Sequence, residues 1–167
     1  MNPTICSIIS ILIFFFGSID AQDSIPTANA EVVKYVESVI GKKVDRGECW
    51  DLANQALTRI NAQWDLKFQY GKLLNPDKDV ILPGDIIQFK NVVVEFKIEK
   101  GNETLTTTET MKQHTAIVHK VFAKGEFEIA HQNTQFSGRK VGLSNLTLKN
   151  IKHGKIFIYR PVVKLGK

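Results

Sequence analysis

The sequence predicts an α+β fold in which N-terminal helices pack on an antiparallel sheet. Between residues 27 and 60, apolar side chains recur at spacings of three and four, which is the period of an amphipathic helix. After residue 79 the period falls to two, and turn sequences such as Pro83-Gly84-Asp85 and Lys124-Gly125 separate short apolar runs. Helices followed by strands, without alternation, are typical of the α+β class.

An apolar leader precedes this pattern. Residues 5–17 form an uncharged run that is too short to span a bilayer well, and the small residue Ala21 follows at a suitable cleavage position. We therefore predict a signal peptide over residues 1–21, a single domain over residues 22–167 and a secreted, extracellular protein. An uncleaved membrane anchor is the alternative interpretation.

Composition limits the partners that we expect. The chain has 167 residues, 43% of them hydrophobic, which suits one domain with a real core. Its net charge of +5 is spread over single and paired basic residues, so we expect no nucleic-acid partner and, after cleavage, no membrane partner. The positive charge suits an anionic polymer such as a cell wall, or simply favours solubility. We expect a monomer.

Two helices are predicted. The first carries its apolar face on Val32, Val33, Val36, Val39 and Ile40, and Gly41 can end it. The second carries a stripe at Cys49, Leu52, Ala53, Ala56, Leu57 and Ile60. Asp45, followed three residues later by Glu48, resembles a capping box and would place Cys49 in the first turn.

The predicted strands follow. Residues 86–89 form one strand, and residues 92–98 and 103–110 form a hairpin around the turn sequence 99–102. Residues 114–123 and 126–133 form a second hairpin, and residues 155–163 form the last strand, with Pro161 near its end.

Cys49 is the one cysteine that remains once the leader and Cys6 are removed. A cysteine attacks as the thiolate, and the free N–H groups of a helix start favour that charge. The placement therefore fits a nucleophile. It also fits a small apolar core residue, and a disulfide-bridged dimer through Cys49 is a third interpretation.

Four histidines are candidates for the base: His114, His119, His131 and His153. We predict that His114 opens a strand and projects into a cleft, that His119 is a packing or surface residue, and that His153 lies in a loop. Alternation places His131 and Asn133 on one strand face, where Asn133 could accept the imidazole N–H. The histidines lie too far apart for a metal motif, and we expect no cofactor and no metal.

Four stretches in order, "GECWDLA", "LPGDIIQF", "HTAIV" and "HQN", resemble the CHAP domain (cysteine, histidine-dependent amidohydrolase/peptidase) of the papain-like superfamily. The resemblance implies a papain-like fold with Cys49 as nucleophile and His114 as general base and acid. It implies Asn133 as the polar partner of His114, with His131 as the alternative. The implied reaction is amide hydrolysis through a thioester, on a peptide or peptidoglycan-like substrate.

This chain departs from the family pattern at three places. His131 stands where the family usually has Glu, and Glu48 replaces the usual Gln before the cysteine, where a carboxylate raises the thiol pKa. Residues 90–113 form an extra segment between the second and third motifs, and we expect it to cover or shape the cleft. A catalytically inactive, secreted CHAP-like binding module, with this insertion carrying the interaction, is the rival interpretation.

Overall fold

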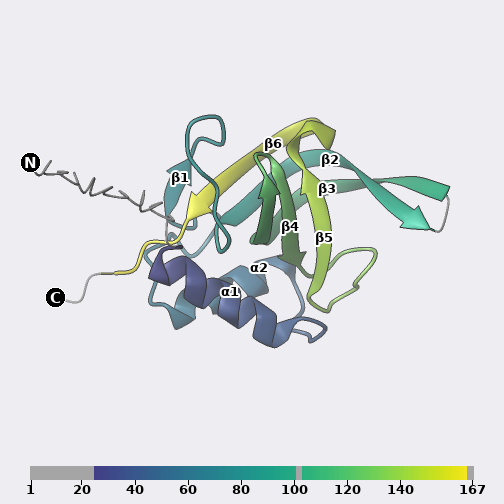
Figure 1. Ribbon diagram of the computed structural model, residues 1–167. Coiled ribbons are helices and arrows are strands. Elements are labelled where there is room, and N and C mark those ends of the chain that lie inside the picture. Colours follow the sequence, from purple (N-terminus) through teal and green to yellow (C-terminus); the bar gives the residue numbers. More distant parts are fainter. Residues whose placement is uncertain (1–24, 101–102, 165–167) are drawn as a thin grey trace, which may run out of the picture.

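The computed structural model describes residues 25–100 and 103–164, and the predicted signal peptide over residues 1–21 lies outside them (Figure 1). Two helices come first, followed by six strands and one 3-10 turn. Their bounds are α1 Thr27–Val39, α2 Cys49–Arg59, β1 Lys72–Leu74, β2 Ile86–Lys100, β3 Glu103–Ala123, β4 Glu126–His131, β5 Gly142–Thr147, η1 Leu148–Asn150 and β6 Ile151–Arg160. No helix among these elements has the length and apolar character needed to cross a membrane.

The six strands form one sheet in the order β1-β6-β2-β3-β4-β5, and every neighbouring pair is antiparallel. The α+β class is confirmed. β2 and β3 stay paired from Ile86↔Ile117 to Lys100↔Glu103, and the far part of this ribbon projects from the sheet as an arm (Figure 1). The arm is the hairpin predicted from the extra segment.

The structure corrects several strand bounds. The predicted strand at 86–89 and the first strand of the hairpin are one continuous β2, and β3 joins the hairpin to the strand of His114. His114 therefore lies inside a strand and does not open one. His153 lies exposed on β6, not in a loop, and β1 and β5 were not predicted. Pairing between neighbouring strands thus continues through positions where the local pattern had separated them.

Alternate positions along the strands supply two apolar clusters. One cluster joins the helices to strand residues such as Ile86, Ile117 and Ala130. The other contains strand residues whose side chains point to the opposite face of the sheet, including Phe89, Phe127, Ile129 and Leu146. The alternation of strand side chains accounts for this division, because successive side chains of a strand point to opposite faces.

The buried faces of the two helices match the predicted apolar stripes in the middle of each helix and differ from them at the helix ends. Leu52, Ala53, Ala56 and Leu57 of the second predicted stripe are buried, as are Val32 and Val36 of the first. Ile40 is exposed, because α1 ends at Val39 and Ile40 instead forms a parallel bridge with Val141.

The turn Pro83-Gly84-Asp85 joins α1 to the sheet. Asp85 is fully buried, and its carboxylate accepts hydrogen bonds from Asn29 Nδ2 at 2.8 Å and from Arg160 Nε at 3.0 Å and Nη2 at 2.9 Å. Gly84 has φ +87°, and a Cβ there would lie 2.5 Å from the carbonyl oxygen of Asn29. The motif is therefore a structural junction between α1, the turn and β6.

Candidate active site

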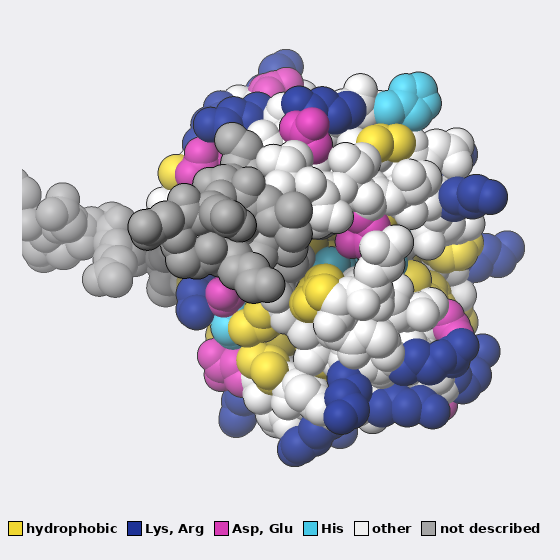
Figure 2. All heavy atoms as spheres, turned by 90° about the vertical axis from the view of Figure 1, so that its right-hand side faces the viewer, with side chains coloured by type: hydrophobic (Ala, Val, Ile, Leu, Met, Phe, Trp, Pro, Cys, Tyr) yellow, Lys and Arg dark blue, Asp and Glu magenta, His cyan; other side chains and the backbone are white. Residues whose placement is uncertain are grey.

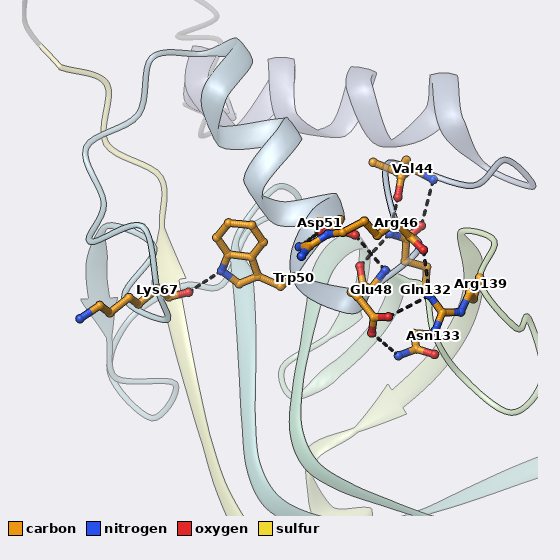
Figure 3. Close-up of polar contacts among 9 residues, drawn as sticks. All are labelled: Val44, Arg46, Glu48, Trp50, Asp51, Lys67, Gln132, Asn133 and Arg139. Atoms are coloured by element: carbon orange, nitrogen blue, oxygen red, sulfur yellow. Dashed lines mark hydrogen bonds and ion pairs between the residues drawn. The ribbon is translucent and has the colours of Figure 1, made fainter.

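The start of α2 places the sulfur. Cys49 is the first residue of the helix and Glu48 is its N-cap; Asp45 lies outside the helix with φ 50°. The side chain of Asp51 accepts a hydrogen bond from the backbone N–H of Glu48 at 3.0 Å and forms an ion pair with Arg46 (Figure 3). The predicted cap was thus three residues too early, and Cys49 lies nearer the positive end of the helix than expected.

Gln132 fixes this helix start against the sheet. Its buried side chain donates to the carbonyl oxygens of Val44 at 3.0 Å and Glu48 at 2.7 Å, and accepts from the N–H of Val44 at 3.2 Å (Figure 3). The pairing of β3 with β4 begins at Ile117↔Ala130, so beyond that point these two strands do not pair with each other. Sequence reasoning missed Gln132, and its only signal was a position next to His131.

The sulfur of Cys49 has opposing influences on its charge. Backbone N–H groups of Thr115, Trp50 and Cys49 itself stabilise the thiolate, while burial and the Glu48 carboxylate oppose it. Burial is the largest effect, so the pKa of the Cys49 thiol is raised above its ordinary value. The N–H groups of the helix start do favour the thiolate, but the expected net lowering of the pKa is wrong, because desolvation outweighs them together with the N–H of Thr115.

Two histidines and a serine form a row across three strands. His114 Nε2 on β3 lies 2.9 Å from His131 Nδ1 on β4, and His131 Nε2 lies 2.8 Å from Ser144 Oγ on β5. Thr115, whose N–H faces the sulfur, directly follows His114. The row therefore begins one residue from the strand position that contacts Cys49.

Both imidazoles of this row are buried and neutral. His114 is 6% exposed and His131 is 0% exposed. Burial lowers the pKa of His114 to about 4. Burial, and then repulsion by a charged His114, lower the pKa of His131 to about 3. At neutral pH the thiol of Cys49 is thus protonated and both rings of the row are neutral.

The side chain of Asn133 is directed to Glu48 in this arrangement. β4 ends at His131, and Asn133 has φ 62°, so the alternation that would have placed both residues on one face is broken. Its side chain donates to Glu48 Oε2 at 2.7 Å, and Arg139 pairs with Glu48 Oε1 at 2.9 Å (Figure 3). His131, the alternative partner predicted from the sequence, lies beside His114.

The remaining histidines take other positions. His119 is buried and its Nδ1 lies 2.7 Å from Glu128, which agrees with a packing role. His153 is exposed on β6. Within the described residues, no group of three or more His, Cys, Asp or Glu side chains is arranged to hold a metal.

Aromatic and polar groups support the strand beside the sulfur. The hydroxyl of Tyr70 lies 2.9 Å from Thr115 Oγ1, and both hydroxyls hydrogen bond to the buried Gln88. The rings of Trp50, Trp64 and Tyr70 follow one another with centroid separations of 5.6 Å. Trp50 also donates its indole N–H to the carbonyl of Lys67 at 2.6 Å (Figure 3). These contacts fix Thr115, whose backbone N–H contacts the sulfur, and Trp50, which follows Cys49 in α2.

The arm and the loop between β4 and β5 meet near the histidine row. The carboxylate of Glu109 on β3 accepts the backbone N–H of Gln135, although burial raises the pKa of Glu109 overall. The centroid of the exposed Phe136 ring lies 5.3 Å from that of the His131 ring.

Basic side chains gather on one part of the surface. Figure 2 shows the molecule from the side on which the arm projects, and Lys and Arg side chains gather there on the side of the helices. Exposed basic residues of the two loops beside α2 are Lys42, Lys43, Arg46, Arg139 and Lys140.

A cysteine at a helix start, in contact with a strand that carries a buried histidine, fits a cysteine-proteinase-fold domain. The family model of the AIM3/BBC1 cysteine proteinase-fold domain matches residues 25–165, and the chain belongs to this family. The expected papain-like cysteine-proteinase fold is thereby confirmed, and the finer resemblance to the CHAP domain stays a prediction.

The structure is similar to a solved one described as "The crystal structure of Ly7917", with a TM-score of 0.47 and 14% sequence identity. The match covers 78% of this chain and 62% of the other, so this chain spans less than two thirds of that chain's length. The curated proteins contain no match to this sequence.

Proposed function

We propose that this protein is a secreted, CHAP-type cysteine hydrolase that cleaves an amide bond in a peptide or a peptidoglycan-like substrate. The family and its fold support a peptidase-like activity. The observation that carries the proposal is the contact of the sulfur with the backbone N–H of Thr115, the residue that directly follows His114 on β3. His114 is itself hydrogen bonded to His131. Nucleophile, base and orienting group are thus available on α2, β3 and β4.

The proposed reaction begins with a neutral pair. Because burial raises the thiol pKa and lowers that of His114, the proton moves during attack and not before it. The sulfur forms a bond to the substrate carbonyl carbon while His114 takes the thiol proton. The N–H of Cys49 stabilises the oxyanion. The C–N bond then breaks, and the leaving amine takes the proton from His114.

A water molecule completes the cycle. The water oxygen attacks the thioester carbonyl carbon while His114 takes one proton from the water. The C–S bond breaks, the carboxylic acid leaves and the thiolate regains the proton from the imidazole. His131 keeps the ring of His114 oriented in both halves, the role that Asn133 was expected to fill.

Mass spectrometry of the acyl-enzyme tests this proposal directly. The wild-type protein is mixed with peptide amides and with peptidoglycan fragments, and both released amine and a thioester adduct on Cys49 are measured. Cys49→Ala and His114→Ala should abolish turnover. His153→Ala is the matched control, because His153 is exposed on β6 and should leave the rate unchanged. Turnover that survives Cys49→Ala would contradict the proposal.

A second candidate function is a catalytically inactive binding module. The raised pKa of Cys49 and the lowered pKa of His114 favour it, because both disfavour the ion pair of an activated thiol. In that case neither turnover nor an adduct forms with either substrate class. A peptidoglycan or peptide ligand would then bind equally well to wild type and Cys49→Ala.

A further inference from the structure

We propose that Ser144 is a positioning residue that sets the direction of the hydrogen-bond row through His131 to His114. Nothing in the sequence motifs points to this residue. It lies on β5, and β5 itself was not predicted. The catalytic meaning of the inference rests on the proposed function, but the proton positions that it specifies do not.

The row can run in two directions. In one, His114 Nε2–H donates to His131 Nδ1, and His131 Nε2–H donates to Ser144 Oγ. In the other, the Ser144 hydroxyl donates to His131 Nε2, and His131 Nδ1–H donates to His114 Nε2. Each neutral imidazole has one donor and one acceptor nitrogen, so the choice made at one end fixes every proton in the row.

Only the first direction leaves His114 able to act as a base. There His114 carries its proton on Nε2, and its Nδ1 keeps a free lone pair. In the reverse direction Nδ1 is protonated and Nε2 is occupied by His131, so no nitrogen of His114 can take the thiol proton. In a catalytic triad the third residue orients the histidine through the ring nitrogen that does not face the nucleophile. Here the third residue is the neutral ring of His131, whose own orientation depends on the hydroxyl of Ser144.

The structure explains why a hydroxyl at position 144 can do this. His131 pairs with Gly142 in the β4–β5 register, so Ser144 is a diagonal neighbour within reach of the long imidazole. His131 is fully buried and Ser144 is partly exposed, so the serine is the polar end of the row nearest to solvent. Its hydroxyl proton can point away to water while its oxygen accepts from His131 Nε2–H.

Nitrogen-15 NMR of the histidine rings tests the inference without any substrate. In wild-type protein at neutral pH we expect both His114 and His131 to carry the proton on Nε2. In Ser144→Ala the buried Nε2–H of His131 loses its acceptor, and the fraction of His114 protonated on Nδ1 should rise several-fold. Ser144→Thr keeps the hydroxyl and should restore the wild-type spectrum, while Ser38→Ala on α1 is the matched control.

Two results would overturn the inference. One is a wild-type spectrum that shows the proton on His131 Nδ1; this measurement does not depend on the folding of any variant. The other is a His114 tautomer that is unchanged by Ser144→Ala. If the protein turns over substrate, Ser144→Ala should also lower kcat about tenfold with little change in KM. A correct tautomer order without turnover would refute the proposed function and leave the role of Ser144 intact.

Discussion

Acidification should destabilise this protein through its two buried histidines. His114 and His131 have folded-state pKa values of about 4 and about 3, against an ordinary histidine value of 6.5. Between those values the unfolded chain binds more protons than the folded one. Stability is therefore fully present above pH 6.5 and is lost as the pH falls toward the folded pKa values.

The size of the loss follows from the shift. One pKa unit corresponds to about 1.4 kcal/mol, so each histidine that stays neutral in the fold should remove about 2 kcal/mol between pH 7 and pH 5. The pair should remove about 4 kcal/mol, a large part of the stability of a domain of this size. Most carboxylates remain charged over this window, which isolates the histidine contribution.

Urea denaturation at pH 7, 6 and 5 measures this dependence. The reference is the double variant His114→Gln/His131→Gln, in which amides replace both rings and all other groups titrate as before. The difference in the free energy of unfolding between wild type and variant should shrink by about 4 kcal/mol on acidification. Equal pH slopes in the two proteins would refute the claim that both rings are buried and neutral.

Three further predictions concern other contacts. Asp85→Ala should lower the free energy of unfolding by about 3–5 kcal/mol, because it leaves the Arg160 guanidinium without its buried carboxylate partner. Urea denaturation checks this: the loss of stability in the Asp85→Ala/Arg160→Ala double variant should be clearly smaller than the sum of the losses in the two single variants. Gly84→Ala should cost more than about 1 kcal/mol, since φ is +87° and the added Cβ meets backbone; thermal unfolding would expose an error if Tm did not fall. Iodoacetamide should label Cys49 more slowly than a free cysteine peptide at neutral pH, with the rate rising in alkaline solution; faster labelling at pH 6 would show that its pKa is lowered.

Local patterns in the sequence determined the helices and the class of the fold. The three-four spacing of apolar residues from Leu52 to Leu57 predicts a helix with one buried face from the helical period alone. The backbone preferences of Lys124-Gly125 predict the turn between β3 and β4. The position of Cys49 at a helix start was also predicted, although the cap is Glu48. These features depend on residues within a few positions of each other.

The third group of the site depended on tertiary structure. Asn133 and His131 are two residues apart, and the alternation of an ideal strand would place both beside His114. β4 ends at His131, and the left-handed backbone at Asn133 turns its amide toward Glu48. Where a strand ends is decided by pairing with distant segments, and no local signal carried that information.

The charge state of the site was likewise decided only by folding. The sequence shows the helix N–H groups that favour a Cys49 thiolate, but the desolvation that outweighs them depends on which strands and loops surround the sulfur. The same holds for the neutral His114 and His131. Proximity along the chain sets local geometry, whereas burial is a property of the whole packed molecule.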